Sequence, residues 1–162
     1  ALSLNRDKAL VTVKAFTGLP HRCQLVAEAG GVRWFNDSKA TNVGATLAAL
    51  TGIGESIDGK VILIAGGQGK GQDFSPLAEP ARQYLRAALL MGEDRATLAQ
   101  GMSAAPCELV ADMQAAVARA HALAQPGDAV LLSPACASFD MYSSFVARGD
   151  DFSARAREVC HD

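Results

Sequence analysis

Short, continuously apolar runs alternate along this sequence with longer stretches rich in Ala and Leu. Runs of the first kind are "VILIA" at 61–65, "AALLM" at 87–91 and "DAVLLS" at 128–133, and the stretches at 43–50 and 113–124 are of the second kind. A run without polar alternation indicates a strand buried on both faces, and strands that alternate with helices are typical of βαβ units. The sequence therefore predicts a mostly parallel sheet with helices on both faces.

Residues 22–37, "RCQLVAEAGGVRWFND", hold two further strand-like runs around Gly30 and Gly31. Glycine adopts the positive φ of a tight turn at little cost, so we expect these runs to form a β-hairpin. Its first strand would lie antiparallel at the edge of the sheet. With a short strand in "CELV" at 107–110, the sequence predicts an α/β fold, a Rossmann-like three-layer sandwich of about five parallel strands plus one antiparallel edge strand.

Polar residues mark where two of the helices are expected to begin. Thr41 or Asn42 precedes the first Ala-rich stretch and can accept a hydrogen bond from its free N–H groups. The closing helix is expected in "DDFSARAREVC" at 150–160, with Asp150 or Asp151 as its N-cap.

Composition excludes several classes of protein. The 162 residues suggest one domain, and a net charge of -2 without a cluster of Lys or Arg argues against nucleic-acid binding. The apolar runs are too short to span a bilayer, and the first residues lack the apolar core of a secretory signal, so no membrane partner is expected. The four cysteines are widely spaced and form no C-x-x-C pair. We therefore expect reduced thiols, a cytoplasmic location and no structural zinc or disulfide.

Three polar segments follow predicted strands, where ligands bind in open α/β sheets. They are loop 1, "NDSKATN" at 36–42; loop 2, "AGGQGKGQD" at 65–73; and loop 3, "SPACASFD" at 133–140. Because the carboxyl ends of parallel strands share one edge of the sheet, we expect these loops to meet there.

Loop 1 places a cation, a hydroxyl and an acid at a helix N-terminus. Free N–H groups and a partial positive charge attract anions there, and Lys39 and Thr41 add a full charge and a hydroxyl donor. Asp37 would repel an anion and is better suited to accepting hydrogen bonds from hydroxyls such as those of a ribose. A capping cluster beside a solvated lysine is an equally good interpretation of this spacing.

Loop 2 has the position of a phosphate-binding turn but not the sequence of a P-loop, because Gly66 and the Gly69-Lys70 pair are separated by two residues instead of four. Its glycines allow close approach of a ligand and hold Lys70 on a turn, although a flexible glycine loop is a serious alternative. In loop 3, backbone N–H groups beside Ser138 resemble an anion-binding nest. No G-x-S-x-G elbow makes this serine a nucleophile, and Cys136 is expected to be a packing residue.

If the loops meet, their lysines and hydroxyls form one cationic pocket. A charge-assisted hydrogen bond contributes roughly 1.5–3 kcal/mol, so three or four of them could hold a small dianion. The ligand expected there carries carboxylates or phosphates.

Four motifs together resemble the C-terminal domain of the Mur ligases, in order and at matching spacing from about residue 18 to the C-terminus. They are "GLPHR" at 18–22, "NDSKATN" at 36–42, "GGQGKGQDF" at 66–74 and "SPACASFD" at 133–140. The resemblance implies an ATP- and Mg²⁺-dependent ligase of bacterial peptidoglycan synthesis. Within the family, the likeness is to the branch that joins D-glutamate to UDP-N-acetylmuramoyl-L-alanine through an acyl phosphate.

The resemblance also implies roles for residues that match the family's motifs. Thr41 and Lys70 would hold the α-carboxylate of D-glutamate, while Ser138 and the backbone near Phe145 would hold its side-chain carboxylate.

A second set of residues would reach the nucleotide, ATP or ADP, which a neighbouring domain supplies. Arg22 would approach its phosphate and Asp37 its ribose. Lys39 would act as the catalytic residue by neutralising the charge of the phosphate or acyl phosphate.

The chain departs from the family in its length. The family's UDP-binding domain and its central ATPase domain with a true P-loop do not fit into 162 residues. Residues 1–17 resemble at most the tail of the central domain or a hinge, with a short helix expected at 7–16, and residues 18–162 would be the C-terminal domain. The chain alone is then expected to be a monomer that forms no amide bond.

Two other interpretations remain open at this point. One is a stand-alone nucleotide- or anion-binding module without catalysis, and the other is a scaffold domain whose polar loops are only caps. The scaffold interpretation predicts that Lys39 and Lys70 point into solvent, away from each other.

Overall fold

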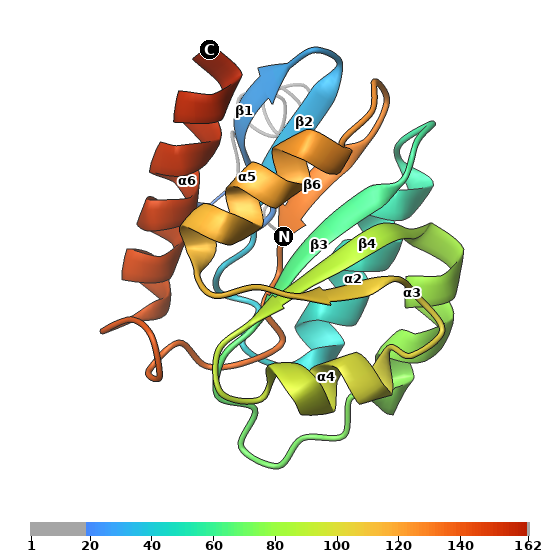
Figure 1. Ribbon diagram of the computed structural model, residues 1–162, viewed down its shortest axis with the longest axis vertical. Helices are drawn as coiled ribbons and strands as arrows, with labels where there is room; N and C mark the ends of the chain where they lie inside the picture. The colour runs from blue at the N-terminus through green and yellow to red at the C-terminus, as the bar shows by residue number, and fades with distance from the viewer. Residues whose placement is uncertain (1–18, 162) are drawn as a thin grey trace, which may run out of the picture.

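The computed structural model describes residues 19–161, and the helix expected at 7–16 lies outside them. The described chain is a six-stranded sheet with helices on both faces (Figure 1). Its elements are, in chain order, β1 (Gln24–Ala29), β2 (Val32–Asn36), α2 (Val43–Glu55), β3 (Val61–Gly66), the 3₁₀ turn η1 (Ser75–Leu77), α3 (Ala78–Tyr84), β4 (Leu85–Met91), α4 (Arg95–Gly101), β5 (Cys107–Leu109), α5 (Met113–Leu123), β6 (Ala129–Leu132) and α6 (Phe145–His161).

The six strands lie in the order β1-β2-β6-β3-β4-β5, and they confirm the predicted, mostly parallel sheet with one antiparallel edge strand. β1 is antiparallel to β2 across a turn in which Gly30 and Gly31 have φ of 59° and 76°, and every other pair is parallel. β6 is inserted between β2 and β3. Loops 1, 3 and 2 therefore leave the sheet from three adjacent strands at the same edge.

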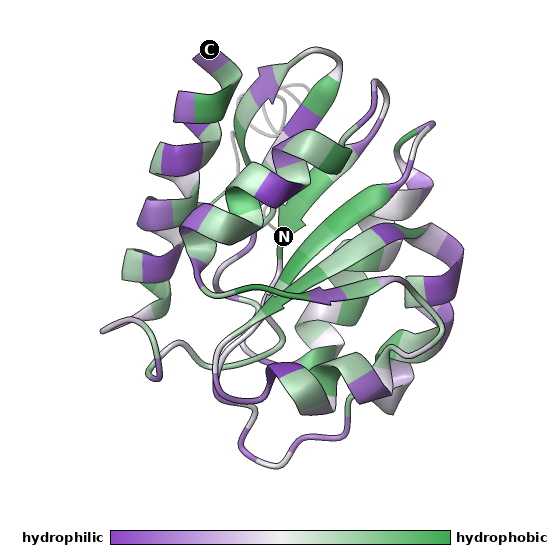
Figure 2. Cartoon of the chain, in the orientation of Figure 1, coloured by the Kyte–Doolittle hydropathy of each residue, from purple (hydrophilic) through white to green (hydrophobic). Residues whose placement is uncertain are grey.

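Alternate residues of the central strands point into two separate hydrophobic cores. Val61 and Leu63 of β3 pack with α2, α3 and α4, whereas Ile62 and Ile64 pack with α5 and α6. Figure 2 shows the central strands in the hydrophobic colour and hydrophilic residues on the outer turns of the helices. This arrangement confirms the three-layer sandwich. No helix within residues 19–161 has both the length and the apolar character needed to cross a membrane.

The N-caps agree with the sequence at one helix and differ at another. The Asn42 side chain accepts a hydrogen bond from Ala45 N (2.9 Å) and caps α2 as expected. α6, however, begins at Phe145, and Ser144 Oγ accepts the hydrogen bond from Ala147 N (3.1 Å) near its start. Asp150 and Asp151 therefore lie inside α6, and the expectation that one of them caps it was wrong.

Gly149 explains why the start of α6 was misplaced. A glycine between an arginine and two aspartates resembles the end of a loop, but this one is buried in the first half of the helix. A Cβ at this position would collide with Ser38 Oγ and His21 Nδ1. The glycine thus permits the close approach of α6 to loop 1, a tertiary requirement that local sequence does not reveal.

Candidate ligand-binding site

The buried side chain of Arg148 in α6 forms hydrogen bonds with all three loops. Its guanidinium donates hydrogen bonds to Ser38 O in loop 1 (3.1 Å) and Gly66 O in loop 2 (3.4 Å). It also donates to Cys136 O (3.0 Å) and Ala137 O (3.3 Å) in loop 3. The predicted meeting of the three loops is therefore present, and one side chain holds them together.

The Arg148 guanidinium is unusual because it is only 1% exposed and its acceptors are carbonyl groups. Burial lowers its pKa to about 10, which leaves it charged at neutral pH. A buried charge is costly unless hydrogen bonds replace its water, and here four carbonyl oxygens do so. Its Nε has no partner within residues 19–161.

Loop 2 presents Lys70 on a tight turn that runs from Gly69 to Gln72. Gln72 N donates to Gly69 O (3.1 Å), and the two central residues, Lys70 and Gly71, have φ of 54° and 73°. Two consecutive positive φ values are the pattern of a type I′ turn. Glycine adopts this conformation freely, but for a lysine it costs about 1 kcal/mol or more, so the surroundings must hold Lys70 there.

The backbone of loop 2 is fixed along most of its length. Gln68 and Ala137 exchange two hydrogen bonds of 3.0 Å, which join loops 2 and 3 as a short β-bridge. Gly69 N donates to Asp94 Oδ2 (2.6 Å), and Gly66 N donates to Pro134 O (2.9 Å). These bonds argue against the alternative of a flexible glycine loop.

Loop 3 is more buried than its small residues suggested. Residues 133–138 are all buried, because the loop is covered by loop 2 and lies over Arg148. Ser138 is 3% exposed, and its hydroxyl makes no hydrogen bond within residues 19–161. Cys136 is fully buried, and burial, with a smaller contribution from nearby Asp94, raises the pKa of its thiol to about 12. Cys136 is therefore a packing residue, as expected, and Ser138 keeps a hydroxyl available for a ligand.

Arg22, Asp37 and Lys39 line one cavity of 260 Å³ beside the first turns of α2. Asp37 is buried, and it accepts hydrogen bonds from Cys23 N (3.2 Å) and Ser133 Oγ (2.9 Å). Burial and the neighbouring Asp37 carboxylate raise the pKa of the Cys23 thiol to about 11, so this thiol is neutral. The cavity is thus lined by one carboxylate acceptor and two cations.

Burial raises the pKa of Asp37, although hydrogen bonds from Ser133 and Cys23 and the nearby Arg22 oppose the shift. When a carboxyl has a higher pKa in the folded state than in the unfolded state, deprotonation destabilises the folded protein. The stability falls as the pH rises from the pKa of the unfolded state, about 3.9, to the pKa of the folded state, and it stays lower at higher pH. Asp37→Asn is therefore expected to increase the free energy of unfolding at neutral pH. Asn can still accept from Cys23 N and can donate to Ser133 Oγ.

Urea unfolding of the wild type and Asp37→Asn at neutral pH measures this difference, with the exposed Asp58→Asn as the matched control. The advantage should vanish below about pH 3.9, where the wild-type carboxyl is protonated in both states. A less stable Asp37→Asn at neutral pH would contradict the expectation.

Lys39, Thr41 and Phe145 connect this cavity to the start of α6. Lys39 Nζ lies 4.8 Å from the centre of the Phe145 ring, within the range of a cation–π contact. Thr41 N donates to Lys39 O (2.9 Å), so the two residues form one compact turn. Lys70 Nζ lies 6.0 Å from the Phe139 ring, at the outer limit of such a contact. Thr41, Lys70 and Ser138 make no hydrogen bonds to one another within residues 19–161, and their joint action on a ligand stays a prediction.

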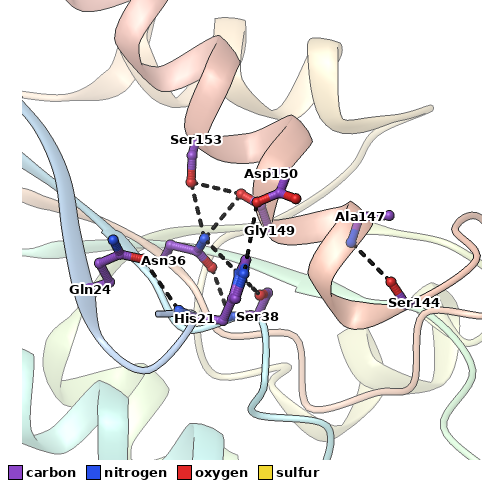
Figure 3. A network of polar contacts seen from close by, with 9 residues as sticks. All are labelled: His21, Gln24, Asn36, Ser38, Ser144, Ala147, Gly149, Asp150 and Ser153. Carbon is purple, nitrogen blue, oxygen red and sulfur yellow. Dashed lines mark hydrogen bonds and ion pairs between the residues drawn. The ribbon is translucent and has the colours of Figure 1, made fainter. Parts of the chain in front are cut away.

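His21 anchors loop 1 to α6 through the polar network in Figure 3. Its Nδ1 lies 3.2 Å from Asn36 Nδ2 and 3.1 Å from Ser38 Oγ. Asn36 Nδ2 also donates to Gly149 O (3.0 Å). The other ring nitrogen, Nε2, lies 3.8 Å from Asp150 Oδ1 of α6. His21 thus has a structural role that no motif had assigned.

Sequence reasoning missed three residues that shape the site: Arg148, Gln72 and Asp94. Asp94 follows β4, and a polar segment after a fourth strand was a usable signal. Arg148 gave no signal, and Gln72 stood in loop 2 without an assigned role, because their hydrogen-bond partners come from segments far apart in the sequence. Among residues 19–161, no group of three or more His, Cys, Asp or Glu side chains could hold a metal ion.

The sequence matches known proteins over its whole length. The family model "Mur ligase, glutamate ligase domain" matches residues 21–136. The UDP-N-acetylmuramoylalanine–D-glutamate ligase of Alcanivorax borkumensis is 89% identical over 162 residues, which are 100% of this chain and 37% of that protein. The ligase of the same name from Nitrosococcus oceani is 56% identical over 160 residues, 98% of this chain and 35% of that protein. The chain thus spans little more than a third of the length of these relatives.

Solved structures share the fold at much lower identity. A murein peptide ligase from Psychrobacter arcticus superimposes with a TM-score of 0.66 at 15% identity, over 99% of this chain and 34% of that chain. This similarity concerns the arrangement of strands and helices, and it agrees with the three-layer sandwich described above.

Proposed function

The chain belongs to the Mur ligase family, whose glutamate ligase domain it matches, and from this premise we propose that it is the amino-acid-binding domain of a longer ligase. The longer protein would join D-glutamate to UDP-N-acetylmuramoyl-L-alanine in bacterial peptidoglycan synthesis. ATP would phosphorylate the carboxylate of that substrate, and the D-glutamate amine would attack the acyl phosphate to form the amide and release phosphate. Residues 1–17 would link the preceding domain to residues 18–162.

The observation that supports this proposal most strongly is the joining of loops 1, 2 and 3 by Arg148. A dicarboxylate such as D-glutamate needs two anion-binding groups at a fixed separation. Lys70 and Thr41 on loops 2 and 1 would hold its α-carboxylate. Ser138 on loop 3, with the backbone near Phe145, would hold the side-chain carboxylate, which would give the Ser138 hydroxyl, unbonded within residues 19–161, a partner.

The cavity between Arg22, Asp37 and Lys39 would receive the nucleotide. Asp37 would accept hydrogen bonds from ribose hydroxyls, Arg22 would approach phosphate, and Lys39 would neutralise the phosphate or acyl-phosphate charge. Mg²⁺ and the γ-phosphate would be held mainly by parts of the longer protein outside this chain. Because its nucleotide substrates belong to the bacterial cytoplasm, we place the enzyme there.

Phosphate release by the full-length protein tests the proposal. Release is expected only with ATP, UDP-N-acetylmuramoyl-L-alanine and D-glutamate together, and L-glutamate is expected to replace D-glutamate poorly. Residues 1–162 alone should release none, because the γ-phosphate site lies elsewhere. Nucleotide binding without D-glutamate-dependent turnover by the full-length protein would favour the binding-module alternative instead.

A further inference from the structure

The side chain of Gln72 reaches three segments from its place at the end of the Lys70 turn. Its Nε2 donates to Gly69 O (2.9 Å) in its own loop and to Ala135 O (3.2 Å) in loop 3. Its Oε1 accepts a hydrogen bond from Val43 N (3.2 Å), the first residue of α2. One amide group therefore uses both donor positions and its acceptor.

Two of these hydrogen bonds, to Val43 N and to Gly69 O, stabilise segments next to the proposed ligand-binding residues Thr41 and Lys70. The Val43 N–H is one of the helix-terminal donors that have no partner within the helix, and Gln72 satisfies it from another loop. Gly69 O accepts from both the backbone and the side chain of Gln72, which closes the turn that carries Lys70. The same side chain thus fixes the Lys70 turn and the helix that follows Thr41.

We propose that Gln72 is a positioning residue, which holds the Lys70 turn against α2 and loop 3 so that Lys70 and Thr41 face one ligand carboxylate. The inference rests on the proposed function for the identity of that ligand, D-glutamate. Gln72 itself does not need to touch the ligand. An amide is required because its Nε2 donates to Gly69 O and Ala135 O while its Oε1 accepts from Val43 N. A glutamate carboxylate of the same shape would face these two oxygens without a proton between them.

Kinetics of the full-length enzyme with Gln72→Glu and Gln72→Ala test the proposal. Both variants are expected to raise the D-glutamate KM about tenfold, while kcat and the ATP KM change less than about twofold. Gln100→Ala, an exposed glutamine of α4, is the matched control. If Gln72 acts through Lys70, Gln72→Ala should add little in a Lys70→Ala background. An equal fold-change in both backgrounds, or an unchanged KM for Gln72→Glu, would overturn the inference.

Amide hydrogen exchange separates this inference from the proposed function, because it needs no substrate. In full-length Gln72→Glu, exchange is expected to accelerate at Val43 and through residues 69–72, and to stay unchanged in β4 and α5. Unchanged exchange at Val43 would show that Gln72 does not hold α2 and would overturn the inference even in an active enzyme. Accelerated exchange in an enzyme that does not use D-glutamate would retain the positioning role and reject only the proposed substrate.

Discussion

Lys70→Ala in the full-length protein is expected to raise the D-glutamate KM by about 10- to 150-fold, the factor that corresponds to a lost charge-assisted hydrogen bond of roughly 1.5–3 kcal/mol. The fold should be preserved, because the Lys70 side chain is exposed and has only a distant contact with Phe139. Steady-state kinetics with D-glutamate varied, together with thermal unfolding, measure both quantities. The effect should be specific to the amino acid, so the ATP KM should change little.

Lys60→Ala is the matched control for this experiment. Lys60 is also exposed, but it precedes β3 and so lies at the amino ends of the parallel strands, away from loops 1, 2 and 3. Its Nζ donates to Gln83 O there. Ser138→Ala should likewise raise the D-glutamate KM while Lys60→Ala leaves it unchanged. Wild-type kinetics for Lys70→Ala would remove Lys70 from the site.

Arg148→Met is expected to destabilise the chain by about 3–5 kcal/mol, because a buried carbonyl left without a donor costs roughly 1–3 kcal/mol and several would be left so. Methionine fills much of the same volume, but Ser38 O, Gly66 O and Cys136 O would each lose the Arg148 donor. Ala137 O would still accept from Gln68 N. Arg148→Lys should destabilise the chain less, because lysine keeps the charge and some of the donors. It should still destabilise it, because a single ammonium cannot replace the planar fork of guanidinium donors. Urea unfolding of the chain measures both changes.

Arg157→Met provides the control on the same helix. Arg157 is exposed and donates a single hydrogen bond to Val26 O (3.3 Å), so its loss should alter stability by less than about 0.5 kcal/mol. If Arg148→Met unfolds at the same urea concentration as Arg157→Met, Arg148 does not hold the loops together.

The sequence predicted the fold where local pattern determines it. β3 is apolar without interruption and is buried on both faces, and the glycine pair at 30–31 forms the hairpin turn. The meeting of the loops followed from a general property of parallel sheets. The sequence could not reveal that β6 lies between β2 and β3, because strand order depends on contacts between distant segments.

The contacts inside the site were less predictable than its position. Gly149 resembles a helix terminator in the sequence, and only the packing of α6 against loop 1 explains it. Arg148 lies outside the motifs and Gln72 lies in one that assigned it no role, yet each satisfies backbone groups on several segments. Their partners exist only after the sheet has formed, so no local pattern could identify them.

The place of β6 in the sheet has a consequence for biosynthesis on the ribosome. β2 and β3 are translated before β6, residues 129–132, which is the strand that separates them in the sheet. Until that strand emerges, the two facing strand edges lack their partner, and such edges are prone to pair wrongly. Loop 3 can therefore join loops 1 and 2 only after β6 has been translated, and a product that ends before residue 133 would lack this loop.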